Sequence, residues 1–446
     1  MGARAIPYNR NMNAPEWTIR ALRAALADGT ARPSELAEQA LSRSNGNAGH
    51  NTYLWQDAKW TRAEAARAEA IPRGEGGPFG DGRSALWGLP VSVKDCFDLA
   101  GAPTTVGVRF LAEMNGNAAR DSWLVEQLRA AGAVIIGKTH VHPLTYGITG
   151  ENPEFGDCTL PGKPDALTGG SSSGAVASVL EGSAVAAIGT DTGGSVRAPA
   201  ALAGLAGYRA TLGRGDWRGG AHLAESFDTM GWLFRDLKDA PLLAAPFAPA
   251  NAASVRRFRY FAMVGSEFLH DCEPEIVANL EATARDLESL GLERHTFDAD
   301  WWTDATNIFV PIQASESARI HAGNLDRIQP EIRERLERGA RIGGDQIKAL
   351  RRRHDEFRER MDELFATHEL LLLPAIPVAR LAVGADHSQT RPRLLRYTMP
   401  FSLAGVPALT IPRSQGGMQL AAARDADESL LHIAGQLGAQ RKAAKS

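Results

Sequence analysis

Apolar residues recur at helical spacing, every three to four positions, between residues 18 and 70. They are Leu22, Ala25 and Leu26, followed by Leu36, Ala40 and Leu41. Ser34 and Glu35 stand just ahead of the second group, as polar residues do where a helix begins. The pattern predicts an amphipathic helical part at residues 1–70. Residues 73–84 are rich in Gly, Asp and Pro, which predicts an exposed loop.

Short apolar runs replace the helical pattern after this loop. The run Pro90–Val93 predicts a strand that ends at Lys94, and the run Ala133–Ile136 predicts a second buried strand closed by Gly137. Residues 124–131, which lie between them, again show helical spacing. Strand, helix and strand in this order are typical of an α/β fold with a largely parallel or mixed sheet.

The rest of the chain contains three further patterns. Small residues at Gly174–Gly182 predict a tightly packed helix between two glycine-rich turns. The charge-laced residues 330–368 predict two helices, broken at 339–344, whose charges mostly face solvent. Apolar residues at Leu370–Leu373 predict a strand, and residues 401–412 predict another strand region punctuated by glycine and proline.

Composition narrows the class of protein. The chain has 446 residues, of which 44% are hydrophobic and 23% charged, values typical of a soluble globular protein. Its 49 Lys and Arg against 52 Asp and Glu give a net charge of -3, so there is no basic excess to neutralise phosphates. We therefore expect a small-molecule substrate and no nucleic-acid partner.

Cysteine usage and the N-terminus bear on location. The three cysteines, Cys96, Cys158 and Cys272, are widely spaced and form no CxxC pair, which predicts a reducing compartment without disulfides. The N-terminus lacks an apolar core of signal-peptide length, and no stretch approaches the roughly 20 apolar residues of a membrane span. We expect a cytoplasmic protein without a membrane segment.

Two glycine- and serine-rich segments are the candidates for chemistry, TGGSSSGAVAS at 168–178 and GTDTGGSVRAPAA at 189–201. Paired glycines let backbone amides and a small hydroxyl approach a ligand without obstruction by Cβ atoms. Either segment alone is typical of a tight turn in a small-residue core. Their order changes the interpretation, because Lys94 ends a strand upstream and Ser195 lies 24 residues beyond Ser171.

This set and spacing resembles the amidase signature family, which includes bacterial amidases, aryl-acylamidases and urethanases. Further segments in family order are GENPEFG at 150–156, GYRAT at 207–211, ESFDTMGWLFRD at 225–236, LLLPAIP at 371–377 and MPFSLAGVPALTIP at 399–412. The resemblance implies the amidase signature fold, a large mixed and mostly parallel sheet covered by helices on both faces. It also implies a single amidase domain over residues 1–446, with a catalytic core at 85–240 and the remainder of the domain at 241–446.

The chemistry of acyl transfer explains why these residue types would occur together. A serine hydroxyl is a weak nucleophile, so it needs a base within hydrogen-bond reach and donors for the developing oxyanion. A lysine serves as base only when neutral, so its pKa must fall from about 10.4 through burial. The resemblance implies that Lys94 is the base, that Ser171, after a cis peptide bond, relays the proton, and that Ser195 forms the acyl-enzyme.

The resemblance assigns supporting roles as well. It implies an oxyanion hole of backbone N–H groups and an ion pair, Asp191 with Arg197, that braces the turn. The oxyanion-hole residues are Thr192, Gly193, Gly194 and Ser195. Asn152 lies 19 residues before Ser171, which keeps the family spacing and places the carbonyl of Thr145 near the substrate. The candidates for substrate binding are Thr145, Tyr146, Gly147, Ser172, Arg209 and Met399.

Aromatic and other apolar residues predict the character of the substrate pocket. Those that could line it, or lie in the core instead, are Trp217, Phe227, Met230, Trp232, Tyr146, Met399 and Phe401. They favour hydrophobic aryl amides or carbamates. The chain departs from the family pattern at Ser173, where a glycine is usual, and at Ala210, where a proline is common.

The expected activity is hydrolysis of carbon–nitrogen bonds other than peptide bonds, in amides or in closely related carbamates, with esters as side substrates. No metal or organic cofactor is implied, and we expect a monomer or homodimer. A glutaminase-type component of an amidotransferase is the main alternative, and a non-catalytic scaffold is the distant one. Rival chemistries are weaker: a thiol nucleophile at Cys96, a metal pair on one strand face at His140 and His142, and a Ser-His-Asp triad, which would need a GxSxG elbow.

Overall fold

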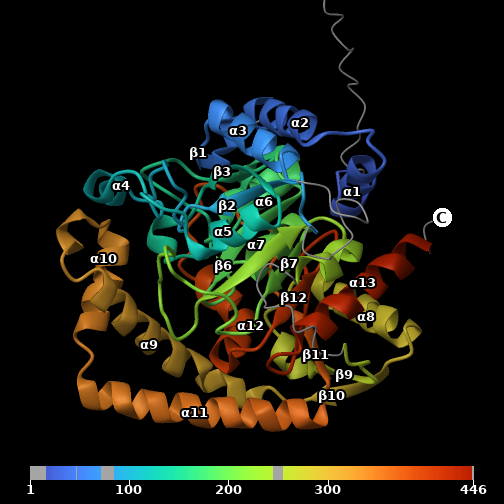
Figure 1. The fold of residues 1–446 in the computed structure, drawn as a ribbon. Helices are drawn as coiled ribbons and strands as arrows, with labels where there is room; N and C mark the ends of the chain where they lie inside the picture. The colour runs from blue at the N-terminus through green and yellow to red at the C-terminus, as the bar shows by residue number, and fades with distance from the viewer. Residues whose placement is uncertain (1–16, 47, 72–84, 245–254, 444–446) are drawn as a thin grey trace, which may run out of the picture.

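The computed structural model describes residues 17–46, 48–71, 85–244 and 255–443. The loop predicted at 73–84 lies outside these ranges. An 11-stranded sheet runs through the described residues in the order β1-β3-β2-β6-β8-β7-β12-β13-β11-β9-β10 (Figure 1). Its strands are β1 (Tyr53–Trp55), β2 (Pro90–Lys94), β3 (Val134–Thr139), β6 (Ala186–Asp191), β7 (Ala206–Arg209), β8 (Thr229–Phe234), β9 (Tyr260–Val264), β10 (Glu293–Phe297), β11 (Leu370–Pro374), β12 (Ala408–Ile411) and β13 (Met418–Ala422). A separate hairpin pairs β4 (Thr159–Leu160) with β5 (Lys163–Leu167).

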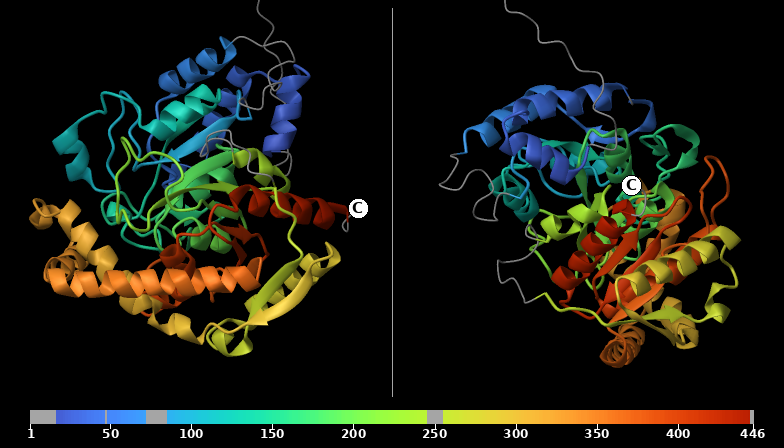
Figure 2. Two further views of the ribbon diagram at one scale, coloured as in Figure 1. Left: turned by 60° about the horizontal axis from the view of Figure 1, so that its bottom comes forward. Right: turned by 90° about the vertical axis from the view of Figure 1, so that its right-hand side faces the viewer.

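The helices come from every part of the chain. They are α1 (Ile19–Ala27), α2 (Pro33–Gly46), α3 (Ala58–Glu69), α4 (Arg109–Asn115), α5 (Trp123–Ala130), α6 (Ser173–Glu181), α7 (Arg197–Ala203), α8 (Pro274–Ser289), α9 (Ala305–Ile320), α10 (Pro330–Ala340), α11 (Gly344–Thr367), α12 (Thr390–Ala404) and α13 (Asp427–Ala443). Helices α1–α3 lie at one end of the molecule and α11 at the opposite end, and α10 lies at the side (Figures 1 and 2). No described helix combines the length and apolar character needed to cross a membrane.

The strand directions correct part of the prediction. Strands β3, β2 and β6 are mutually parallel, as the βαβ pattern predicted, and so are β11, β9 and β10. The strands between these groups pair antiparallel, and β1 is antiparallel to β3, so the sheet is mixed but mostly antiparallel. The expectation of a mostly parallel sheet is therefore wrong. The connection between β12 and β13 shows why such neighbouring strands pair antiparallel. Only a few residues join them, and so short a link cannot carry the chain back to start a parallel strand.

Helices cover both faces of the sheet, as predicted. Along β6, Ala186 and Ile188 pack into one apolar cluster together with Leu128 of α5. Ala187, whose side chain points to the opposite face, packs into a second cluster with Val176 of α6. Strand residues alternate between the faces, so the continuous apolar sequence of β6 is explained by burial on both sides.

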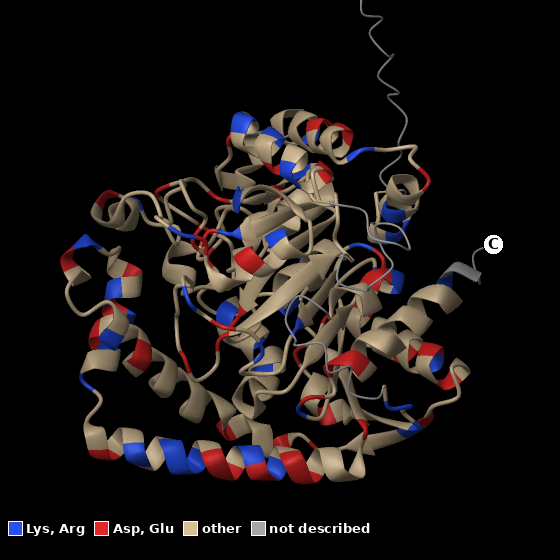
Figure 3. Cartoon of the chain, in the orientation of Figure 1, with Lys and Arg blue, Asp and Glu red and all other residues tan. Residues whose placement is uncertain are grey.

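The helical opening is present as α1–α3, and the charged stretch forms α10 and α11, with residues 341–343 between them. Charged residues mark most of α11, which lies along one edge of the molecule (Figure 3). The strand region predicted from residue 401 is wrong in its first part, because Phe401 belongs to α12 and β12 begins only at Ala408. Gly405 ends α12 with a φ of 66°, a left-handed cap that glycine adopts freely.

Candidate active site

Lys94 ends β2 and is completely buried. Its Nζ donates to Ser171 Oγ over 2.7 Å and to Thr190 Oγ1 over 2.7 Å. Because β2 and β6 run parallel, the end of β2 lies beside Thr190 near the end of β6. Burial lowers the pKa of Lys94 to about 8, although nearby negative groups oppose that shift. About a tenth of the amine is therefore neutral at pH 7, far more than for an ordinary lysine.

Ser171 lies in the turn that precedes α6, and the Gly170–Ser171 peptide bond is cis. The turn is fixed by its backbone. The Ser171 carbonyl accepts from the N–H of His142 over 3.2 Å, and the N–H of Gly170 donates to the carbonyl of Ile148 over 2.8 Å. These bonds hold the Ser171 hydroxyl against the Lys94 amine.

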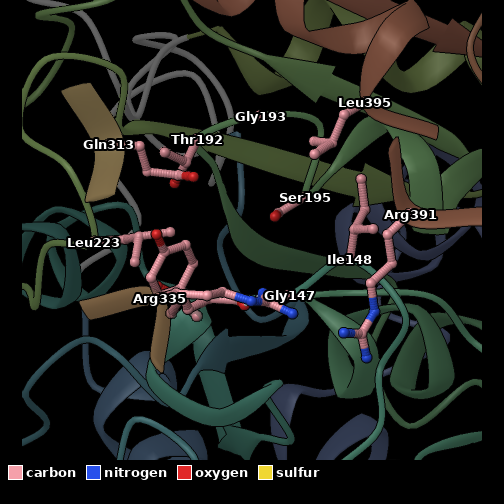
Figure 4. A pocket seen from close by; sticks show the side chains of 12 residues that line it. Gly147, Ile148, Thr192, Gly193, Ser195, Leu223, Gln313, Arg335, Arg391 and Leu395 are labelled. Carbon is pink, nitrogen blue, oxygen red and sulfur yellow. The ribbon is translucent and has the colours of Figure 1, made fainter. Parts of the chain in front are cut away.

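Ser195 lies in the turn between β6 and α7, with 6% of its surface exposed. The two glycine-rich turns are bonded to each other, since the N–H of Ser172 donates to the carbonyl of Ser195 over 3.3 Å. The Ser172 hydroxyl also donates to the carbonyl of Thr190 over 3.2 Å. Figure 4 shows the Ser195 hydroxyl pointing into a pocket. The fold thus brings Lys94, Ser171 and Ser195 into one buried region.

Asp191 braces the turn that carries Ser195. Its carboxylate accepts from Arg197 Nη2 over 2.9 Å and from Arg209 Nη1 over 3.0 Å, and all three side chains are fully buried. The N–H of Gly194 donates to Asp191 Oδ1 over 2.8 Å. Burial alone would raise the pKa of Asp191, but the two guanidinium groups outweigh it and hold that pKa well below its usual range. Asp191 is therefore a permanent anion at the base of the turn.

The pocket in front of Ser195 is partly open, and its empty space, including the part open to solvent, is about 440 Å³. Its lining combines backbone-rich turns, apolar side chains and two arginines. The lining residues are Thr145, Tyr146, Gly147, Ile148, Thr192, Gly193, Ser195, Leu223, Gln313, Arg335, Arg391 and Leu395. Thr145 has a φ of 56° and Leu144 a φ of 53°, so this loop turns through the left-handed region beside the pocket.

Four residues proposed from the sequence lie elsewhere. Ser172 is buried between the two turns, and Arg209 is paired with Asp191. Met399 is 1% exposed and packs in the core. Gly194 has its N–H bonded to Asp191, and it is outside the pocket lining. Most of the apolar residues suggested for the pocket are also in the core: Phe227, Met230, Trp232 and Phe401 are each fully buried.

The sequence did not single out several residues of the site. Thr190 directly precedes Asp191, yet a threonine on a buried strand carries no signal of its own. Arg335 belongs to the charged stretch that was expected to face solvent, and only the packing of α10 turns it towards the pocket. Arg391 and Gln313 come from α12 and α9, distant in sequence from both serine turns.

The rival chemistries find little support in the geometry. Burial raises the pKa of Cys96 to about 12, which leaves its thiol protonated. His140 and His142 follow the end of β3 at Thr139, so the expectation that they share a strand face is wrong. His140 Nε2 lies 2.9 Å from the carbonyl oxygen of Gly156. Within the described ranges, no group of three or more His, Cys, Asp or Glu side chains could hold a metal ion.

Comparison with known proteins identifies relatives over most of the chain. Residues 35–431 match the model of the protein family described as Amidase. Indoleacetamide hydrolase of Pseudomonas savastanoi is 31% identical over an alignment of 455 positions, which covers 93% of this chain and 94% of the relative. One subunit of the glutamyl-tRNA(Gln) amidotransferase of Koribacter versatilis is 33% identical over 294 residues, or 62% of this chain and 60% of the relative. A crystal structure of an amidase superimposes with a TM-score of 0.85 at 28% identity, covering 95% of this chain and 99% of the other.

Proposed function

The chain belongs to the amidase family of carbon–nitrogen hydrolases that act on bonds other than peptide bonds, and we propose that it cleaves small amides through an acyl-enzyme on Ser195. The observation that carries this proposal is the contact between Lys94 and Ser171. A buried amine with a pKa lowered to about 8 lies 2.7 Å from a serine hydroxyl on the turn bonded to Ser195.

The proposed proton path runs through these three side chains. Neutral Lys94 accepts the proton of the Ser171 hydroxyl, and Ser171 accepts the proton of Ser195 as Ser195 Oγ attacks the substrate carbonyl. When the tetrahedral intermediate collapses, the same relay returns a proton to the departing amine. Water then attacks the acyl-enzyme, with the relay again serving as base, and releases the acid.

Backbone donors would stabilise the oxyanion that forms on the attacked carbonyl. Thr192, Gly193 and Ser195 all line the pocket, and we assign the oxyanion hole to their N–H groups. We leave Gly194 out, because its N–H already donates to Asp191. In this proposal Gly194 is needed because, without a side chain, it lets the Ser195 turn pass close to Thr398 of α12. Asp191, with Arg197 and Arg209, fixes the whole turn.

The pocket suits a small substrate with both apolar and polar parts. Ile148, Leu223 and Leu395 supply apolar surface, and Gln313 supplies an amide. Carbamates and esters would react through the same acyl chemistry, and we include them as secondary substrates. We also propose that the protein acts in the cytoplasm as a monomer or homodimer, without a cofactor.

A second candidate is the glutaminase component of an amidotransferase, which the likeness to the Koribacter versatilis protein favours. That function requires partner chains that receive the ammonia. Purification of the chain from its native cells distinguishes the two: the hydrolase is isolated alone and active, whereas the glutaminase component is recovered in a stable complex.

The mechanism is tested with a panel of 4-nitroanilide, aryl carbamate, ester and primary amide substrates. Ser195→Ala should lower kcat/KM at least about 10³-fold on each substrate that the wild type turns over. Lys94→Ala should impair amide cleavage more than ester cleavage, because an amine leaving group needs a proton. Cys96→Ala is the matched control, since Cys96 lies two residues from Lys94 and has no part in the proposed chemistry. Wild-type turnover by Ser195→Ala would refute the mechanism.

A further inference from the structure

Two arginines reach the Ser195 pocket from different helices. Arg335 comes from α10 and Arg391 from α12, and both line the pocket. Figure 4 shows them approaching from opposite sides, with the Arg335 guanidinium beside Gly147 and the Arg391 guanidinium lower on the right, pointing away from Ser195. Their side chains are only 23% and 18% exposed. Two cations this far from solvent require negative partners.

Carboxylates of the protein now fill this need. Glu331 Oε1 contacts both Arg335 Nη2 and Arg391 Nη1, so one carboxylate bridges the two guanidinium groups. Arg391 Nη2 also donates to Glu151 Oε2 over 2.9 Å, and Arg335 Nη1 donates to the carbonyl of Tyr146 over 3.0 Å. Arg391 Nε is buried and finds no hydrogen-bond partner among the residues that the structure describes. The charges of the two arginines are therefore balanced by those of the two glutamates, but one hydrogen-bond donor of the cluster, Arg391 Nε, has no partner among the described residues.

The two carboxylates are held very differently. Glu151 is 28% exposed, and the Thr149 hydroxyl donates to it over 2.6 Å. Glu331 is 59% exposed and lies in the first turn of α10, where water can solvate it as soon as it turns outward. Ion pairs with a partner this exposed contribute little to stability. Glu331 is therefore the carboxylate that another anion can replace.

We propose that this pair of arginines is a carboxylate-binding subsite, which Glu331 occupies in the free enzyme and the substrate's own carboxylate occupies during catalysis. The proposal rests on the proposed amide hydrolysis and names its substrate class, amides that carry a carboxylate. An exchange is required because both positive charges are already balanced. A carboxylate that entered without displacing Glu331 would leave the cluster with a net negative charge in a poorly solvated place.

The exchange also explains the mixed lining of the pocket. The arginines hold the anionic end of the substrate, Ile148 and Leu395 contact its methylene groups, and the amide reaches Ser195. Half-amides of short unbranched dicarboxylic acids have this form on the acyl side, and N-acyl amino acids have it on the amine side. The position of the carboxylate relative to the scissile bond distinguishes these two sources.

Direct binding gives a readout that does not depend on turnover. Half-amides with one to four methylene groups, the diamides of equal length, N-acetyl amino acids and N-acetyl amino acid amides are titrated into Ser195→Ala by calorimetry. We expect one of the two carboxylate series to bind at least about tenfold more tightly than its neutral amide counterpart, because charge-assisted bonds to guanidinium are strong. The preferred series shows on which side of the scissile bond the carboxylate lies.

Variants then test each member of the cluster. Arg335→Gln and Arg391→Gln are made separately, in case one does not fold. Each should bind the carboxylate ligand and its neutral counterpart about equally well. In the active enzyme, the loss should appear mainly as a higher KM for the carboxylate substrate. Glu331→Gln should increase affinity for the carboxylate ligand at least about threefold, because the competing anion is removed. Arg333→Gln is the matched control, since Arg333 is on α10 but outside the pocket lining.

The outcomes separate this inference from the proposed function. If the enzyme cleaves neutral amides in a Ser195-dependent manner but shows no carboxylate preference at any length, the subsite is refuted and the hydrolase stands. A preference that Arg333→Gln reduces as much as Arg391→Gln, or that Glu331→Gln weakens, also refutes it. A carboxylate ligand that binds through both arginines supports the subsite even where Ser195→Ala retains activity and the mechanism fails.

Discussion

The Nζ of Lys94 donates to Thr190 Oγ1 over 2.7 Å, the same length as its bond to Ser171 Oγ. A neutral amine has two N–H groups and one lone pair. If one N–H is directed to Thr190, the lone pair can turn towards the Ser171 hydroxyl, which is the orientation that a base requires. Thr190 is thus a positioning residue, since it contacts the base and does not itself line the pocket.

Replacing Thr190 with valine tests this relationship. The bond to Thr190 stabilises the charged form of Lys94, so its loss should lower the Lys94 pKa further. Activity, which rises as Lys94 loses its proton, should then rise at a lower pH. We also expect kcat to fall about tenfold or more through loss of orientation. Thr190→Ser should restore both the pH profile and most of the activity. A purely structural role for Thr190 would leave the pH profile of the valine variant unchanged.

The pH dependence of the wild-type enzyme follows from the Lys94 pKa of about 8. Burial lowers this pKa from the ordinary lysine value of 10.5, so the neutral base appears as pH rises through about 8. We expect kcat/KM for an amide to increase about tenfold per pH unit below that value and to level off above it. Rates measured from about pH 6 to 10 provide the test. A rate independent of pH over this range would exclude Lys94 as the base that titrates.

The sequence predicted which residues gather around Ser195 better than it predicted the sheet around them. Lys94, Ser171 and Ser195 could be identified because their motifs are short, rich in glycine and in a fixed order. Strand direction depends on how distant segments return to the sheet. The apolar runs of β7, β8 and β12 predict buried strands, but they do not indicate whether a strand pairs parallel or antiparallel with its neighbour. The expectation of mostly parallel strands came from the βαβ pattern at β2 and β3, where it was correct, and it failed between β6 and β11, where every pair of neighbouring strands is antiparallel.

The lining of the pocket was also hard to predict, for a related reason. Tyr146 and Gly147 directly follow Thr145, which the spacing between Asn152 and Ser171 had placed near the substrate. Arg335, in contrast, is one of many arginines on charged helices. Only the packing of α10 against α9 decides that Arg335 lies inside and Arg333 does not line the pocket. Met399 was proposed from a motif, but its place on α12 directs it into the core.

Asp191→Asn should destabilise the protein strongly. The substitution keeps the size of the side chain but removes the charge that balances Arg197 and Arg209, both fully buried. Leaving buried charges without their counterion costs about 3–5 kcal/mol in the free energy of unfolding. Denaturant unfolding measures this loss. Asp304→Asn is the control, because its ion pair with Arg353 is 46% and 41% exposed and should contribute about 1 kcal/mol or less. Equal losses in the two variants would contradict the bracing role of Asp191.

Gly194→Ala should inactivate the enzyme, because α12 leaves no room for a methyl group at this turn. A Cβ on Gly194 would lie 2.7 Å from Thr398 Cβ and 3.0 Å from its Cγ2, and the φ of 133° is itself unfavourable for alanine. Thr398 cannot withdraw freely, since its hydroxyl donates to the carbonyl of Gly193 in the same turn. The turn must then shift, and the N–H groups of Gly193 and Ser195 shift with it.

Gly213→Ala isolates the effect of the close approach from that of the backbone angle. Gly213 has a φ of 90°, and a Cβ there would meet nothing within 4 Å. We expect this control to lose about 1–3 kcal/mol of stability from the unfavourable φ alone and to keep its kcat. Gly194→Ala should lose kcat by about 10²-fold or more, since displaced oxyanion donors cost that much, even under conditions where the variant remains folded. A folded Gly194→Ala enzyme with wild-type kcat would show that the Ser195 turn does not need its contact with α12.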